Sequence, residues 1–167
     1  MSTILEPPRI PFRVGQTPPD FTLYTDANEP LTLSSLKGKT IVLFFYPKDD
    51  TPGCTAEACS FRDNLPRFGE LNAVVLGISP DTWRKHRNFK KKYNLPYTLL
   101  ADDNHAVAER YGLWVEKLFW GRKYMGVART TFIIGPDGRV AKIFEAVNPE
   151  DHAKEVAAAV AELSAKR

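Results

Sequence analysis

The chain has little of several features that would otherwise direct its interpretation. No run of residues approaches the roughly 18 apolar positions that a membrane span needs, so no membrane contact is expected. The formal net charge is only +3, which by itself indicates no nucleic-acid partner. Residues 1–13 contain neither the charged nor the apolar stretch of a secretory leader. The expected location is therefore the cytoplasm.

Metal ligands are equally sparse. The three histidines, His86, His105 and His152, are scattered singly, and none has a ligand-type partner at helical spacing. A structural zinc site needs about four converging side chains. The histidines are therefore expected at the surface, and neither a metal nor another cofactor is predicted.

Only two cysteines are present, Cys54 and Cys59. A chain of 167 residues can bury a sufficient core without a disulfide. In the cytosol, where thiols are kept reduced, such a pair is more often catalytic or redox-sensing than a permanent crosslink. The two thiols are thus the first candidates for function.

The order of predicted elements indicates one α/β domain. Residues 1–19 hold five prolines and form an extended lead-in, so regular structure is expected to begin near Asp20 and a single domain to cover residues 20–167. The segment 113–126 lacks periodicity and predicts a loop. Strands are predicted at Phe21–Tyr24, Ile41–Tyr46, Ala73–Ile78 and Tyr97–Leu100, with a hairpin of Thr130–Gly135 and Arg139–Glu145. Helices are predicted after Thr51, from Ser79 and Pro80 to Tyr93, at His105–Tyr111, and from Asn148 to Leu163. This order predicts a thioredoxin-like fold, in which helices flank a central mixed β-sheet.

Cys54 falls in the first turn of the helix that follows the central strand. Thr51 is a favourable N-cap, Pro52 a favoured first helical residue, and Gly53 leaves the backbone open. The unpaired N–H groups and the positive end of the helix dipole favour the thiolate form of Cys54. An inert thiol that fills the core is an equal alternative when Cys54 is considered alone.

The spacing to Cys59 decides between these alternatives. Five residues is neither the spacing of a C-x-x-C motif nor half of a zinc ligand set. On one α-helix the two Cα atoms lie roughly 8.5 Å apart, whereas a disulfide needs less than about 7 Å. A permanent disulfide contradicts the helix, but a reversible one that unwinds the first turns is compatible with it.

The segment Pro47-x-x-x-Thr51-x-x-Cys54 resembles the active-site motif of the peroxiredoxin family, and the spacing to Cys59 resembles its PrxQ, or bacterioferritin comigratory protein, branch. The likeness covers nearly all of the chain. Residues 14–21 are similar to the family's opening segment, and residues 127–134 to its late strand with an arginine.

The resemblance implies a thiol-dependent peroxidase that reduces hydrogen peroxide and organic hydroperoxides. Cys54 would become a sulfenic acid, Cys59 would close a disulfide with it, and thioredoxin or a similar dithiol would reduce that disulfide. Thr51 would hydrogen-bond the peroxide and the thiolate, Pro47 would shield the pocket, and Arg129 would supply positive charge. Because the disulfide lies within one chain, a monomer is expected.

Two other functions remain open at this stage. A disulfide oxidoreductase that acts on protein thiols would also use Cys54, although the C-x-x-C motif is missing. A redox sensor or chaperone would oxidise Cys54 without multiple turnovers. Glu57 is not counted among the site residues, because the helix dipole already explains an acid in the first turns.

Overall fold

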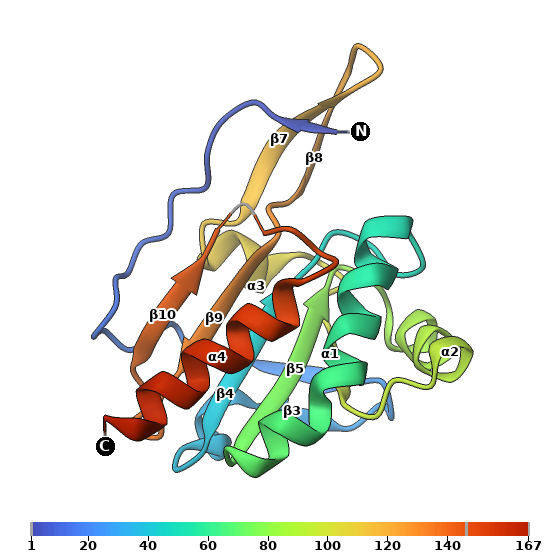
Figure 1. Cartoon of the computed structure of the whole chain (residues 1–167). Helices are drawn as coiled ribbons and strands as arrows, with labels where there is room; N and C mark the ends of the chain where they lie inside the picture. Colours follow the sequence, from blue (N-terminus) through green and yellow to red (C-terminus); the bar gives the residue numbers. More distant parts are fainter. Residues whose placement is uncertain (1, 146, 167) are drawn as a thin grey trace.

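The computed structural model describes residues 2–145 and 147–166. A seven-stranded sheet has the order β10-β9-β4-β5-β6-β2-β3, and a smaller sheet has the order β1-β7-β8 (Figure 1). The strands are β1 Thr3–Ile4, β2 Thr22–Thr25, β3 Pro30–Thr32, β4 Thr40–Phe45, β5 Ala73–Ser79, β6 Thr98–Ala101, β7 Trp114–Phe119, β8 Arg122–Val127, β9 Thr130–Ile134 and β10 Val140–Phe144. The helices are the 3₁₀-helix η1 Leu33–Leu36 and the α-helices α1 Pro52–Glu70, α2 Trp83–Tyr93, α3 Ala106–Arg110 and α4 His152–Ala165.

The centre of the large sheet follows from the two most apolar runs of the sequence. Every residue of β4 is buried, and β4 pairs in parallel with β5 and antiparallel with β9. Strands buried on both faces are expected to be continuously apolar. The parallel pair is joined by α1, which confirms the predicted central mixed sheet with flanking helices.

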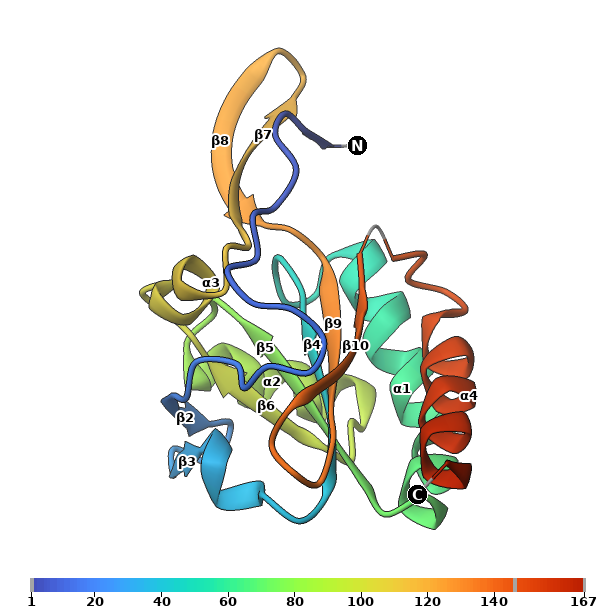
Figure 2. The ribbon, with the colours of Figure 1, turned by 90° about the vertical axis from the view of Figure 1, so that its left-hand side faces the viewer.

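The two faces of this sheet carry separate cores, and α1 and α4 lie along one of these faces (Figure 2). On one face, α1 and α4 lie side by side and, with Phe89 of α2, cover the β4 side chain Phe44, whose ring stacks on Phe61 at a centroid distance of 4.5 Å. On the other face, α3 and the lead-in residue Phe12 cover Phe45 and Phe132. In the described part of the chain, no helix combines the length and apolarity of a membrane span.

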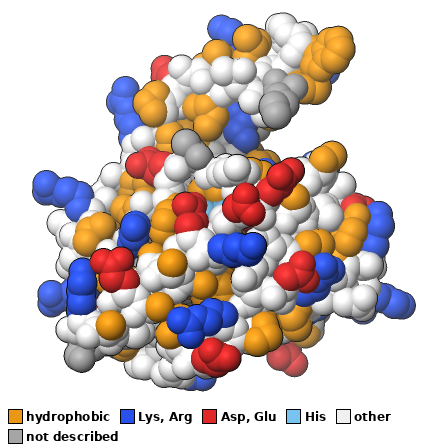
Figure 3. Space-filling view, in the orientation of Figure 1, with side chains coloured by type: hydrophobic (Ala, Val, Ile, Leu, Met, Phe, Trp, Pro, Cys, Tyr) orange, Lys and Arg blue, Asp and Glu red, His pale blue; other side chains and the backbone are white. Residues whose placement is uncertain are grey.

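The prediction of a loop at 113–126 is wrong, because β7 and β8 form an antiparallel hairpin there. Trp120 and Gly121 make its turn with φ values of 52° and 71°, as a tight hairpin requires. Thr3–Ile4 adds a third strand to it, so regular structure begins well before Asp20. The hairpin projects from the body above a hollow and exposes apolar side chains (Figure 3). Because both strands are largely exposed, their residues do not alternate between apolar and polar, and this alternation is the pattern by which a strand is predicted from sequence.

Two of the three histidines are buried rather than exposed, contrary to expectation. His86 is 0% and His152 1% exposed, and both ring nitrogens of each have partners. His152 Nε2 contacts Thr131 Oγ1 at 2.7 Å and thereby joins α4 to β9. A single histidine at an inward helical position can therefore be a core residue when polar groups of other elements satisfy it.

Two helices begin later than predicted. Ser79 pairs with Ala101 at the end of β5, and α2 starts at Trp83 with Thr82 as the cap that accepts the N–H of Lys85. The last helix starts at His152, because the Asn148 side chain accepts an N–H within the preceding turn. Competing local hydrogen bonds of this kind move helix boundaries.

At Gly77 of β5 the core has no room for a larger side chain. A Cβ there would lie 2.8 Å from Leu99 Cδ2 and 2.8 Å from Phe44 Cζ. Gly77→Ala is expected to lower the free energy of unfolding by about 1–3 kcal/mol, because overpacking strains a filled core. The matched control, Gly69→Ala, meets nothing within 4 Å on α1 and should be neutral or stabilising by up to about 1 kcal/mol. Urea unfolding of both variants measures this, and equal effects would contradict the packing argument.

Candidate active site

The first candidate cysteine lies at the start of α1, after the loop that follows β4. Cys54 is the third residue of α1, 1% exposed, and Cys59 is half-buried further along the same unbroken helix. The thiols are not bonded to each other. The helix thus presents Cys54 among the unpaired N–H groups of its first turn, as predicted. It also holds the two cysteines too far apart for a disulfide.

Arg129 brings a positive charge to Cys54. Its Nη2 donates to Cys54 Sγ at 3.2 Å, and its Nη1 donates to Glu57 Oε1 at 2.7 Å. Arg129 lies in the connection between β8 and β9 rather than within a strand. Gly53 makes room for it, since a Cβ there would be 3.3 Å from Arg129 Nη2. The predicted pairing of Cys54 with Arg129 is therefore present in the structure.

Glu57 is the site residue that sequence reasoning missed. It is 0% exposed, and its Oε2 has no partner among the described residues. Burial raises the pKa of Glu57 to about 7, and the charge of Arg129 opposes that rise. Glu57 stands three residues after Cys54 and four before the buried Phe61, on the inward face of α1. The sequence did contain a signal, namely a carboxylate on the apolar face of a predicted helix. A carboxylate buried in this way needs a cationic partner such as an arginine.

Thr51 and Pro47 are half-buried in the loop before α1. Thr51 has the extended backbone of an N-cap, but its hydroxyl donates to the Lys48 carbonyl at 2.9 Å and accepts no helix N–H. The predicted capping bond is therefore absent, and the oxygen of Thr51 keeps its acceptor capacity. The roles of Thr51 toward peroxide and of Pro47 as a shield stay predictions.

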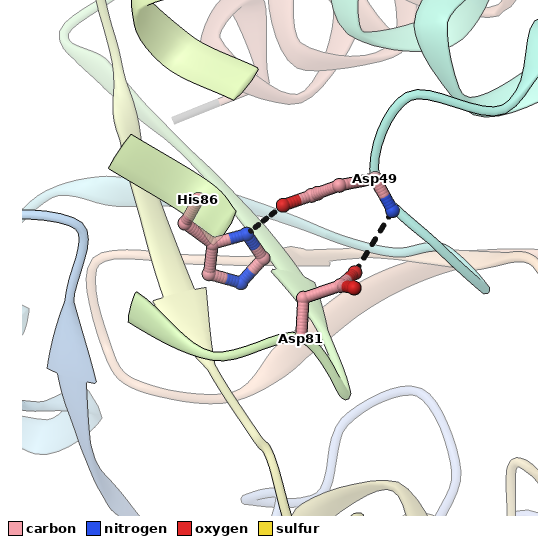
Figure 4. Close-up of side chains that lie close together, drawn as sticks. All are labelled: Asp49, Asp81 and His86. Atoms are coloured by element: carbon pink, nitrogen blue, oxygen red, sulfur yellow. Dashed lines mark hydrogen bonds and ion pairs between the residues drawn. The ribbon is translucent and has the colours of Figure 1, made fainter. Parts of the chain in front are cut away.

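A buried polar cluster fixes this loop to the body (Figure 4). The Asp49 carboxylate contacts His86 Nδ1 at 2.7 Å and accepts the Tyr46 hydroxyl at 2.6 Å, while its backbone N–H donates to Asp81 at 2.8 Å. His86 Nε2 faces the Leu100 carbonyl, so it carries a proton. The loop is thereby held between α2 and the end of β5.

Asp49, Asp81 and His86 are also a potential metal-binding group, since one ligand atom of each lies within 4.8 Å of the others. Each of these groups is already hydrogen-bonded: His86 through both ring nitrogens, Asp81 Oδ2 to Ser79 Oγ at 2.6 Å. A metal would have to displace these bonds. The arrangement fits an anchor for the loop better than a metal centre.

Cys59 has a different environment from Cys54. Burial raises the pKa of the Cys59 thiol, the charge of Arg62 lowers it by a smaller amount, and the charge of Asp63 adds to the rise. The Tyr97 hydroxyl donates to the carbonyl of the preceding residue, Ala58, at 2.7 Å. Within the intact helix Cys59 is therefore a protonated thiol on a fixed segment of backbone.

Comparison with known proteins finds the same type of chain. Residues 14–143 match the AhpC/TSA family. A peroxiredoxin Bcp of Bacillus subtilis is 48% identical over 92% of this chain and 98% of its own length. A putative peroxiredoxin bcp of Coxiella burnetii is 51% identical over 86% and 95%. A bacterioferritin comigratory protein structure from Xanthomonas campestris, described for alkyl peroxide reduction, has a TM-score of 0.82 at 33% identity over 86% and 92%. This likeness confirms the predicted thioredoxin-like fold.

The contact of Gly53 with Arg129 predicts an effect on thiol reactivity. In Gly53→Ala the new methyl group should push the guanidinium away from Cys54 Sγ by a few tenths of an ångström. Weakening a charged hydrogen bond should slow alkylation of Cys54 by iodoacetamide at pH 7 roughly two- to fivefold. Both proteins carry Cys59→Ser, so that one thiol reacts. An unchanged rate would show that the close approach of Arg129 does not govern reactivity.

The raised pKa of Glu57 predicts a pH-dependent stability. The folded state holds a proton on Glu57 up to about pH 7, whereas the unfolded chain loses it near pH 4.5. This stabilising contribution is present at low pH and lost as pH rises through 7. We subtract the free energy of unfolding of the unaltered protein from that of Glu57→Gln. This difference should therefore increase from pH 5 to pH 8 by up to about 3 kcal/mol. Urea unfolding in a Cys54→Ser background, which removes the neighbouring thiol, measures the difference. A constant difference would contradict the buried, shifted carboxyl.

Proposed function

Since this chain belongs to the AhpC/TSA family, within its peroxiredoxin Bcp branch, and acts as a thiol peroxidase, we propose a catalytic cycle carried by Cys54 and Cys59. The observation that carries the proposal is the hydrogen bond from Arg129 to Cys54 Sγ in the first turn of α1. A buried thiolate needs such a donor, because water can no longer stabilise its charge. Among the described residues Cys54 is accordingly the nucleophile.

In the first step the Cys54 thiolate attacks one oxygen of the hydroperoxide. The S–O bond forms as the O–O bond breaks, and the leaving oxygen takes the electron pair and then a proton to become water or an alcohol. Arg129, already oriented by Glu57, stabilises the negative charge before and after transfer. We propose that Thr51, whose hydroxyl oxygen can still accept a hydrogen bond, binds the peroxide. Pro47 limits water in the loop.

In the second step α1 unwinds at its start and Cys59 attacks the Cys54 sulfenic acid. An S–S bond forms, the S–O bond breaks, and water leaves. Unwinding is required because the helix separates the cysteines by more than a disulfide allows. It also exposes Cys59, whose pKa is raised by burial in the folded helix. Exposure therefore makes the resolving thiol more nucleophilic at the moment it is needed.

In the third step an external dithiol returns two electrons and two protons to the disulfide. We propose thioredoxin or a similar dithiol protein as this reductant, and hydrogen peroxide and organic hydroperoxides as substrates. The description of the Xanthomonas protein, alkyl peroxide reduction, supports the organic class. A reducing compartment such as the cytoplasm suits this cycle. Both cysteines lie on one helix, so the cycle needs only a monomer.

Peroxide-dependent NADPH consumption, coupled through thioredoxin and thioredoxin reductase, tests the proposal. The unaltered protein should turn over, and Cys54→Ser should lose turnover, because no other described thiol lies beside Arg129. Cys59→Ser should form one equivalent of sulfenic acid, detected with dimedone, and then stop.

The outcomes separate the parts of the proposal. Turnover retained in Cys54→Ser removes Cys54 as the nucleophile. Undiminished turnover in Cys59→Ser removes it as the resolving thiol. Peroxide-driven loss of two hydrogens from the unaltered protein, seen by mass spectrometry without NADPH consumption, refutes thioredoxin as reductant and leaves the thiol chemistry intact.

A further inference from the structure

His86 is a buried histidine that the cycle above does not use. It lies on α2 and is 0% exposed. Its Nδ1 faces Asp49 Oδ2 at 2.7 Å (Figure 4), and its Nε2 faces the Leu100 carbonyl at 2.8 Å. A carbonyl only accepts, so Nε2 holds a hydrogen, and a bare lone pair on Nδ1 would then repel the Asp49 carboxylate. One proton therefore lies between Nδ1 and Oδ2.

Asp49 is held by both its side chain and its backbone. Its Oδ1 accepts the Tyr46 hydroxyl at 2.6 Å, and its backbone N–H donates to Asp81 Oδ2 at 2.8 Å. Asp81 Oδ2 also accepts the Ser79 hydroxyl at 2.6 Å. The loop residue is thus connected to the ends of β4 and β5 as well as to α2. Buried polar groups that are satisfied in this way specify one arrangement, because any other leaves a polar group unpaired away from water.

Fixing Asp49 also fixes the residues on either side of it. Asp50 has a φ of 58°, in the left-handed region, and its carboxylate accepts the Tyr93 hydroxyl at 2.6 Å. A residue other than glycine keeps this conformation only where its surroundings hold it. The Thr51 hydroxyl donates to the Lys48 carbonyl at 2.9 Å, and the Thr51 carbonyl accepts the first hydrogen bond of α1. Asp49 therefore lies inside the tight loop on which the start of α1 is built.

We infer that His86 and Asp49 are positioning residues of the peroxidase, which hold Thr51 and the first turn of α1 in the arrangement that reacts with peroxide. The inference rests on the proposed cycle and adds the residues that control how readily α1 opens. The first step needs a rigid site, because small misplacements of reacting groups are costly. The second step needs an unwound segment, and a fixed loop at its end limits the conformational entropy gained on unwinding. The Asp49–His86 pair therefore speeds oxidation of Cys54 and slows closure of the disulfide.

Two substitutions of His86 separate its two hydrogen bonds. The amide nitrogen of asparagine occupies the place of Nδ1, and that of glutamine the place of Nε2. His86→Asn therefore keeps a donor toward Asp49, whereas His86→Gln keeps a donor toward the Leu100 carbonyl. Both variants lose the ring, so a difference between them reports the contact with Asp49 and not the loss of packing.

Rapid-quench mass spectrometry of the reduced protein, mixed with hydrogen peroxide, measures the two steps. Oxidation is followed as the gain of one oxygen in a Cys59→Ser background, and closure as the loss of two hydrogens in the chain with both cysteines, at peroxide concentrations that make oxidation fast. His86→Gln should slow oxidation roughly tenfold and speed closure roughly threefold, the effect of about one lost hydrogen bond to a charged group. His86→Asn should stay within about twofold of the unaltered protein in both steps.

Two further variants complete the test. Tyr46→Phe removes the other side-chain donor to Asp49 and should change both steps in the same directions as His86→Gln, by smaller factors. Ile134 is 2% exposed and pairs with Ile41, at the end of β4 remote from the loop. Ile134→Val loses stability through a small cavity and should leave both steps unchanged. Urea unfolding of every variant accompanies the kinetics.

Equal rates in His86→Gln and His86→Asn overturn the inference, because packing of the ring would then explain any change. A change of both steps in the same direction overturns it as well, as does a change that Ile134→Val reproduces. If neither His86 variant folds, Tyr46→Phe decides by the same criteria. Failure of the unaltered protein to gain an oxygen or form the disulfide refutes the proposed function itself, and that outcome is distinct because it does not depend on any of these variants.

Discussion

The guanidinium group of Arg129 connects the reactive thiol to a buried carboxylate, and the rest of the site is arranged around it. Cys54 and Glu57 lie on one face of α1, and both are nearly inaccessible to water. When both are ionised, their negative charges repel each other and lack solvent. The fork of Arg129 donates to both. Gly53 has no side chain to obstruct it.

In the proposed cycle the same helix must satisfy two incompatible geometries. Folded, α1 presents Cys54 to backbone N–H groups and to Arg129; unwound, it lets Cys59 reach Cys54. The structure limits where unwinding has to occur. The loop before α1 is fixed through Asp49 to His86, and the backbone at Ala58 is fixed by Tyr97. Opening can therefore remain local to the turns between these two points, at a free energy below that of global unfolding.

Buried ionisable groups gather at this end of the sheet. Glu57 and Lys117 have pKa values moved toward neutrality, chiefly by burial, and the charge of Arg129 lowers the pKa of both. Such groups lower the stability of the fold, and their retention near a nucleophile is typical of functional sites. The hairpin that carries Lys117 also exposes Trp120, which is 88% accessible.

Sequence reasoning failed where burial depends on distant elements. His86 is an isolated histidine in a basic helix, and only the packing of α2 against Asp49 and Leu100 makes it a core residue. The helix dipole already explains an acidic residue at the position of Glu57. The sequence therefore gave no reason to predict its ion pair with Arg129, which lies 72 residues away. The β7–β8 strands lack a regular apolar pattern because much of their surface faces water.

The sequence by itself determined the place of Cys54 at a helix start, its spacing from Cys59 and the central strands, because local spacing and apolar runs govern those features. Only the tertiary structure decided which charges meet Cys54. Glu57 shares α1 with Cys54, whereas Arg129 comes from the connection between β8 and β9, and the effect of both depends on burial and distance. Electrostatic interactions between remote residues acquire their strength from the shared exclusion of water, which exists only after the chain has folded.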